Sequence, residues 1–141
     1  MLSVILVIGV LISVNDAYLP DGNFAGRLSS PYLFVDCTFV PRSGVSSVHM
    51  VVGCDEEKPA AVARFEIKPA DDKPDEFFIT DFRDRRHESM IEELQKICPK
   101  RGFRKKDFVW FQRVGDDYRV YYAKSTRSVL LTRLTNTSDS V

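Results

Sequence analysis

The spacing of apolar residues most constrains how this chain can fold, because it alternates with a period of two over most of the sequence and takes a helical period only once. Alternation over 31–40, 45–54 and 60–68 places every second side chain on one face, as in a strand with one buried side. The buried faces are expected to hold Leu33, Val35, Cys37 and Phe39, then Val48, Met50, Val52 and Cys54, then Ala61, Ala63, Phe65 and Ile67. The sequence therefore predicts a mostly β protein.

The helical period is confined to residues 84–98. Its apolar side chains recur at the intervals of one amphipathic stripe, made of Met90, Ile91, Leu94, Ile97 and Cys98. Asp84 is a suitable N-cap, and Pro99 with Gly102 is expected to end the helix. Strand-like patterns then return over 107–114, 117–124 and 127–134.

A short apolar segment at 77–82 adds a strand before the helix, after a turn at 69–76 that contains two prolines. The order is therefore about four strands, one helix and three strands. This order predicts a small antiparallel barrel or curled sheet of about seven strands with one packed helix, an α+β protein dominated by β structure. An open α+β sheet is the alternative. We expect one domain over 18–135, followed by a flexible polar tail at 136–141.

The N-terminus predicts export from the cell. An uninterrupted apolar run of thirteen residues at 2–14, followed by the small residue Ala17, is typical of a cleaved signal peptide at 1–17. A buried strand or core helix is the alternative for this run. Because a bilayer-spanning helix needs ~20 apolar residues, we expect no membrane span in the mature form. The predicted localisation is secreted and extracellular.

The chain has three cysteines, and an exported protein is expected to form a disulfide bond with two of them and leave one over. Cys37 and Cys54 lie on neighbouring strand segments, and both point inward. A turn at 41–44 would place Cys37 opposite Val48. Cys54 would then lie about 20 Å from Cys37 at ~3.3 Å per residue, whereas disulfide-bonded Cα atoms lie within ~7 Å. Cys98 can reach either partner, and we favour Cys54–Cys98 over Cys37–Cys98.

Charge is balanced over the chain but concentrated locally. The 20 basic and 20 acidic residues give a net charge of zero, which argues against a surface built for nucleic acid. Five cations nevertheless fall within seven residues between the helix and the next strand, namely Lys100, Arg101, Arg104, Lys105 and Lys106. This basic loop is expected either to be solvated surface or to engage an acidic glycan or another extracellular protein.

Motifs for catalysis are not found in the sequence. His49 and His87 have no second histidine or paired cysteine at metal-ligand spacing, so no metal site is predicted. The chain has neither a Gly-x-Ser-x-Gly turn nor a glycine-rich phosphate loop. We therefore expect a protein that is not an enzyme and that carries no cofactor.

Aromatic residues gather in the last third of the chain. Alternation places Phe108 and Trp110 on one face of their strand and Val109 with Phe111 on the other, so this strand is expected to be covered on both sides. The simplest interpretation is a hydrophobic core. The alternative is a pocket for a small hydrophobic ligand, with Phe108, Trp110, Tyr118 and Tyr121 as its candidate lining.

Three segments resemble signature regions of the lipocalins: DGNFAGRL at 21–28, DDYRVYYA at 116–123 and LLTRL at 130–134. The resemblance matches Gly26 to the family's first-strand glycine, and Asp117, Tyr118 and Tyr121 to its Asp-Tyr-x-x-Tyr turn. It implies a secreted barrel of eight strands that carries a small hydrophobic molecule, with Arg133 covering the closed end. Leu28 stands where the family has a tryptophan, so the family's Trp–Arg stack is not expected. The predicted helix also precedes the last three strands, whereas the family's helix follows the last strand.

Two functions therefore remain open. One is a secreted binding protein that acts through an exposed surface with the basic loop, and the other is a lipocalin-like carrier with an internal cavity. The sequon at Asn136 is a candidate glycosylation site in an exported chain.

Overall fold

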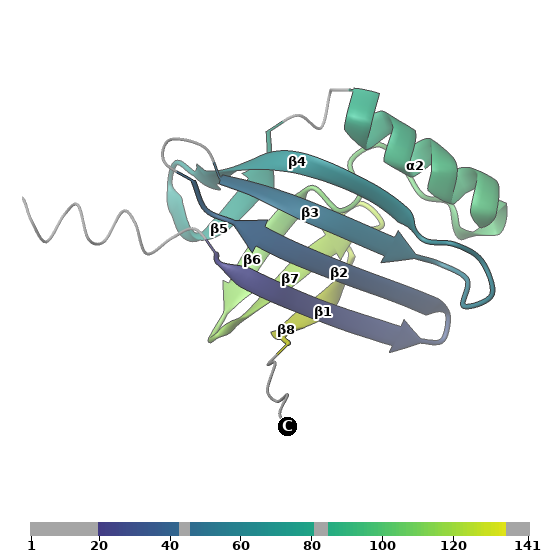
Figure 1. Ribbon diagram of the computed structural model, residues 1–141, viewed down its shortest axis with the longest axis horizontal. Coiled ribbons are helices and arrows are strands. Elements are labelled where there is room, and N and C mark those ends of the chain that lie inside the picture. Colours follow the sequence, from purple (N-terminus) through teal and green to yellow (C-terminus); the bar gives the residue numbers. More distant parts are fainter. Residues whose placement is uncertain (1–19, 43–45, 81–84, 135–141) are drawn as a thin grey trace, which may run out of the picture.

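The computed structural model describes residues 20–42, 46–80 and 85–134, which form a closed antiparallel barrel with a helix packed against it (Figure 1). The strands are β1 (Gly22–Ser29), β2 (Tyr32–Val40), β3 (Ser46–Gly53), β4 (Ala61–Ala70), β5 (Lys73–Ile79), β6 (Trp110–Val114), β7 (Asp117–Tyr122) and β8 (Arg127–Arg133). Helix α2 (Arg85–Ile97) and the 3₁₀ turn η1 (Pro99–Arg101) lie between β5 and β6. Each strand pairs with the next, and β8 pairs with β1. No helix among the described residues has the length and apolar composition that a membrane-spanning helix needs.

The predicted barrel with a packed helix is confirmed, with eight strands instead of about seven. The additional strand is β1, whose sequence GNFAGRLS has two glycines and no β-branched residue, so its strand propensity is low. Pairing with β2 from Gly22↔Phe39 to Ser29↔Tyr32 supplies the structure that local propensity does not. The turn expected at 69–76 is also shorter, because β4 extends to Ala70 and β5 begins at Lys73.

Three expectations concern residues outside the described part of the chain. These are the signal peptide at 1–17, the N-cap at Asp84, and the tail at 136–141 with its sequon at Asn136.

The predicted inward faces of β2, β3 and β4 are confirmed, but the register between β2 and β3 differs by two residues. Cys37 pairs with Met50, and Val48 pairs with Phe39. The connection is longer than a turn at 41–44, since β2 ends at Val40 and β3 begins at Ser46. Because side chains alternate with a period of two, a shift of two residues leaves every side chain on its predicted face.

Aromatic rings fill the barrel at the end where β1 begins. Phe39 lies at the centre of this cluster, with its ring centroid 5.6 to 5.9 Å from those of Phe24, Phe77, Phe111 and Tyr118. The rings of Phe77 and Phe111 are stacked at 4.9 Å. Such pairs contribute about 0.5–1.5 kcal/mol each beyond the burial of their area. The five rings come from five different strands and therefore hold the barrel wall together from within.

Arg133 lies over the outer side of this aromatic cluster. Its guanidinium carbon is 4.7 Å from the centroid of the Phe24 ring, within the range of a cation–π contact. The Trp–Arg stack is absent, as expected, because Leu28 stands where the resemblance places a tryptophan. Arg133 instead contacts the ring of Phe24, which lies two residues before Gly26 in β1, whereas Leu28 lies two residues after it.

Helix α2 closes the barrel where β5 is too short to do so. β4 pairs with β5 only from Ile67 onward, which leaves the first half of β4 beside the helix (Figure 1). The helix buries Met90, Ile91 and Leu94 as predicted, and it also buries His87, which sequence reasoning placed only at the start of the helix. The predicted disulfide Cys54–Cys98 is confirmed, and it joins the end of β3 to the end of this helix.

Gly26 is required where the barrel closes between β1 and β8. The two strands pair at Phe24↔Arg133 and Ala25↔Thr132. A Cβ atom at Gly26 would lie 2.0 Å from the carbonyl oxygen of Leu130, closer than any non-bonded contact allows. Only glycine lets the two backbones approach to this distance.

Replacing Gly26 with alanine is therefore expected to force β1 and β8 apart and to lower the free energy of unfolding by about 1–3 kcal/mol. The measurement is urea denaturation followed by circular dichroism. Gly53→Ala is the matched control, because its Cβ would meet the Cβ of Ala60 at an ordinary 3.7 Å. Equal stability of the two variants would contradict the proposed contact at the β1–β8 closure.

Cys37 is the remaining thiol, and it is fully buried in the barrel. Burial, and to a smaller extent the negative charge of Asp36, raise the pKa of the Cys37 thiol well above its usual range. Because the thiolate is the reactive form, we expect no reaction with a thiol reagent in the native state and one reactive thiol per chain after unfolding. A native thiol that reacts within minutes, or two or three reactive thiols after unfolding, would contradict this assignment.

Candidate binding groove

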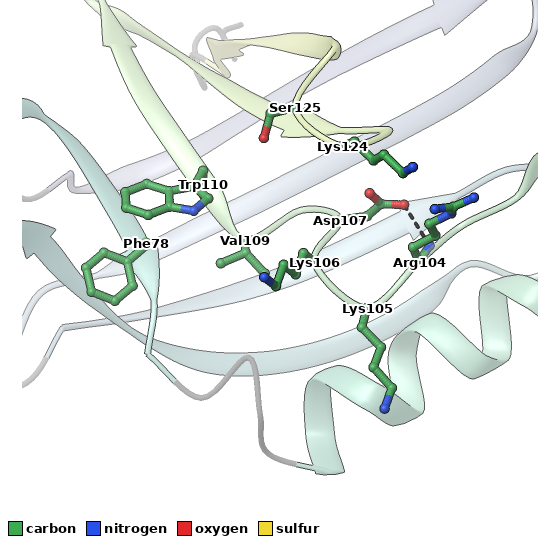
Figure 2. Close-up of a pocket in the computed structure, with 9 residues that line it drawn as sticks. All are labelled: Phe78, Arg104, Lys105, Lys106, Asp107, Val109, Trp110, Lys124 and Ser125. Carbon is green, nitrogen blue, oxygen red and sulfur yellow. Dashed lines mark hydrogen bonds between the residues drawn. The ribbon is translucent and has the colours of Figure 1, made fainter.

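A groove of about 690 Å³ opens on the outer surface of the barrel, between residues 104–107 and the turn that joins β7 to β8 (Figure 2). We call it the rim groove. It is lined by Phe78, Arg104, Lys105, Lys106, Asp107, Val109, Trp110, Lys124 and Ser125. The aromatic side chains come from β5 and β6 and Val109 directly precedes β6, whereas the charged side chains come from the two connections on either side.

The apolar part of the rim groove follows from the pairing of β5 with β6. Phe77 and Phe111 pair with each other and face the core, so the next pair along the strands, Phe78 and Trp110, faces outward. The rings of Phe78 and Trp110 lie 5.1 Å apart. Trp110 is 39% exposed, so part of its ring is open to solvent beside the ring of Phe78.

The cations of the rim groove approach from two directions. Arg104, Lys105 and Lys106 come from one segment, and Lys124 comes from the β7–β8 turn. In Figure 2, Lys105 points toward helix α2, where its ammonium lies 3.3 Å from a carboxylate oxygen of Glu88. Lys106 instead points toward the side of the groove where Val109 and Trp110 lie. The groove therefore has an aromatic wall with positive charge next to it.

The side chain of Asp107 joins the basic segment at 104–106 to the turn between β7 and β8. Its side chain is buried, with 3% of the residue exposed, and one carboxylate oxygen accepts a hydrogen bond from the backbone N–H of Arg104 at 2.8 Å (Figure 2). The other oxygen accepts from the backbone N–H of Ala123 at 2.9 Å. Its backbone carbonyl accepts from Nε2 of His87 at 2.8 Å, which joins helix α2 to the same point. One residue thus fixes the basic segment, the turn and the helix relative to one another.

Backbone strain is concentrated around the rim groove. Within the described residues, the non-glycine positions with positive φ are Phe108 (63°), Ala123 (54°), Lys124 (58°) and Ser125 (64°). Such left-handed conformations cost on the order of 1–3 kcal/mol each and persist only where the surroundings impose them. Here the Asp107 carboxylate and the bond from the N–H of Thr126 to the Ala123 carbonyl impose them. Strain of this kind is typical of functional sites.

The five cations predicted from the sequence as one basic loop do not form one surface. Arg104, Lys105 and Lys106 line the rim groove, whereas Lys100 and Arg101 border a separate hollow beside Arg127. Arg101 donates a hydrogen bond to the Tyr32 carbonyl, and its guanidinium carbon lies 5.3 Å from the Phe103 ring centroid. Its side chain is half-buried and stabilises the fold. Lys124 was not predicted as a site residue, because it stands at the end of the strand-like pattern over 117–124 and far from the basic loop in the sequence.

The four residues predicted as a pocket lining also separate. Phe108 packs in the core, with its ring centroid 5.8 Å from that of Phe103 and 5.5 Å from that of Tyr122. The expectation that Phe108 and Trp110 share a strand face is wrong, because the positive φ at Phe108 turns the chain before β6 begins.

The two tyrosines of that predicted lining point to opposite sides of the wall. Tyr118 lies in the interior cluster, where burial raises the pKa of its hydroxyl while Arg113 and Arg133 act in the opposite direction. Tyr121 faces outward from β7 and donates a hydrogen bond to Oε1 of Gln112 at 2.7 Å.

Comparison with known proteins adds no identity. No protein-family model matches the chain, and no curated protein or solved structure matches it. Within the described residues, no group of three or more His, Cys, Asp or Glu side chains is arranged to hold a metal ion. The site must therefore be interpreted from its own chemistry.

Replacing Asp107 with asparagine tests whether one carboxylate organises the groove. Asparagine has one acceptor oxygen for the two backbone donors, so we expect the free energy of unfolding to fall by about 1.5–3 kcal/mol. Hydrogen exchange at the amides of Arg104 and Ala123 should accelerate at the same time. The matched control is Asp116→Asn in the exposed β6–β7 turn, which should change neither quantity. Unchanged exchange at both amides in the Asp107 variant would show that the segments are held by other contacts.

Proposed function

We propose that this protein is a secreted binding protein that holds an anionic partner at the rim groove and catalyses no reaction. The observation that carries the proposal is the arrangement of cations from two separate segments beside an exposed aromatic wall. Secretion is supported by the apolar N-terminal run and by the disulfide Cys54–Cys98, because disulfides persist mainly in oxidising compartments.

The excess of positive charge in the groove is local. The whole chain has equal numbers of acidic and basic residues, but the groove lining has four cations and one carboxylate. That carboxylate belongs to Asp107, which is buried and bonded to backbone N–H groups. A concentration of cations on a neutral protein creates a field that attracts an anion. The negatively charged partners that an exported protein meets include acidic glycans and the acidic surfaces of extracellular proteins.

A lipocalin-like carrier is the second candidate. It is favoured by the closed barrel of eight strands and by the stack of Arg133 on Phe24 near Gly26, a position that the resemblance assigns to the closed end of that family's barrel. Five aromatic rings meet inside the barrel at this end, so an internal ligand would have to displace or avoid them. A carrier would yield extractable lipid or pigment after purification, whereas a surface-binding protein would not.

Heparin affinity chromatography tests the anion-binding function. The intact protein is expected to be retained at physiological ionic strength, about 0.15 M, and to elute in a steeply salt-dependent manner, because screened charges drive the contact. Changing Arg104, Lys105 and Lys106 together to serine should abolish retention without loss of folding.

The matched control changes Arg64, Lys68 and Lys96 to serine. These three cations are also exposed, and they lie on the outer face of β4 and on α2. The control removes the same net charge, so it should retain most of the heparin affinity if position matters. Equal losses in the two triple variants would indicate a general charge effect, and no retention of the intact protein would reject the proposal.

A further inference from the structure

The shape of the rim groove indicates more than attraction to negative charge. Its volume of about 690 Å³ lies within the range of ~300–1,000 Å³ that is typical of sites for small organic ligands. An extended polyanion lying on the surface has no need of such a hollow. The outward rings of Phe78 and Trp110 offer apolar contact area that a purely ionic partner would leave uncovered.

Trp110 connects the rim groove to a second hollow of about 260 Å³ on its other side. This second hollow is lined by Lys73, Glu76, Trp110, Tyr121 and Ser125. Trp110 and Ser125 therefore contribute to both hollows, and the outward aromatic residues Phe78, Trp110 and Tyr121 come from three neighbouring strands. An apolar group in the rim groove thus has the paired rings of Phe78 and Trp110 beside it.

Three cations of the rim groove are available to an anion, whereas two neighbouring cations are engaged by the protein itself. Arg101 is held by Tyr32 and Phe103, and Lys105 pairs with Glu88. Within the described residues, no carboxylate pairs with the side chains of Arg104, Lys106 or Lys124. These three cations remain at the groove itself and do not continue along the surface as a track.

We infer that the ligand of the rim groove is a small amphipathic organic anion. Its apolar body lies against Phe78, Val109 and Trp110, and its acid group lies among Arg104, Lys106 and Lys124. This inference rests on the proposed function, an anionic partner at the rim groove, and identifies that partner as a small organic acid in place of a glycan or a protein surface. It places the ligand on the outside of the barrel wall, with the interior left packed.

Intrinsic fluorescence gives a direct measurement, because Trp110 is the only tryptophan in the sequence. Laurate, a twelve-carbon carboxylate, is the probe, and dodecanol and acetate are its matched controls without the acid group and without the apolar body. Laurate below its micellar concentration is expected to change the emission of Trp110 saturably with one site per chain. Dodecanol should bind about tenfold more weakly, and acetate should cause no saturable change.

Two double variants locate the acid group. Lys106→Gln with Lys124→Gln should weaken laurate binding about tenfold, because both cations line the rim groove. Lys96→Gln with Lys100→Gln removes the same charge from exposed residues outside the groove and should change the affinity less than about twofold. Circular dichroism spectra and urea midpoints matching those of the unmodified protein would establish that all variants are folded.

Each contrary outcome identifies which statement is wrong. Laurate binding that neither double variant weakens would overturn the inference and favour an internal site. Heparin retention without laurate binding would overturn the inference and leave the proposed function standing. Binding of neither heparin nor laurate would reject both.

Discussion

The closure of the barrel between β5 and β6 is the constraint on which the rest of the structure depends. Only three residue pairs join these strands, and the last of them is Phe78↔Trp110. Beyond this pair, a helix and the segment after it complete the barrel wall in place of paired strands. Helix α2 covers the uncovered half of β4, and Phe103 and Phe108 fill the interior behind it. The disulfide at Cys98 fixes the end of the helix to the end of β3. The rim groove lies at the point where paired strands give way to this packed segment, so its position follows from the short strand.

The buried carboxylate of Asp107 links this closure to the geometry of the groove. It accepts hydrogen bonds from backbone N–H groups on both sides of the groove, and the backbone carbonyl of Asp107 accepts a hydrogen bond from Nε2 of His87 in helix α2. A buried charge is tolerated only where hydrogen bonds replace its hydration. The same bonds hold the left-handed residues of the β7–β8 turn, which would otherwise relax. A rigid rim lets a ligand bind without the entropy cost of ordering two loops.

Sequence patterns predicted those parts of the structure that depend on periodicity. The inward faces of β2, β3 and β4 and the helix stripe follow from periods of 2 and 3.6. The reach of a disulfide bond argued only against Cys37–Cys54, so Cys54–Cys98 was a preference over Cys37–Cys98 that the structure confirms. β1 was not counted among the strands because pairing, not propensity, makes it a strand. The wrong prediction that Phe108 shares a strand face with Trp110 and the unpredicted position of Lys124 in the groove have the same cause. Phe108 and Lys124 have positive φ values, although neither is a glycine, the residue type that normally indicates such a conformation in a sequence. The direction of the chain after them therefore cannot be derived from the local sequence pattern.

The division of the basic loop shows how one local conformation decides which charges act together. Gly102 adopts a left-handed conformation with φ of 71°, directly after the turn η1, and the chain changes direction there. Arg101, before it, reaches back to the carbonyl of Tyr32 at the start of β2, whereas Arg104, after it, lies beside Asp107. Lys124 then joins the second group from a turn far along the sequence. The anion that we propose for the rim groove would therefore meet cations that Asp107 brings together, whereas Lys100, which borders a separate hollow, would act on it only through the long-range field.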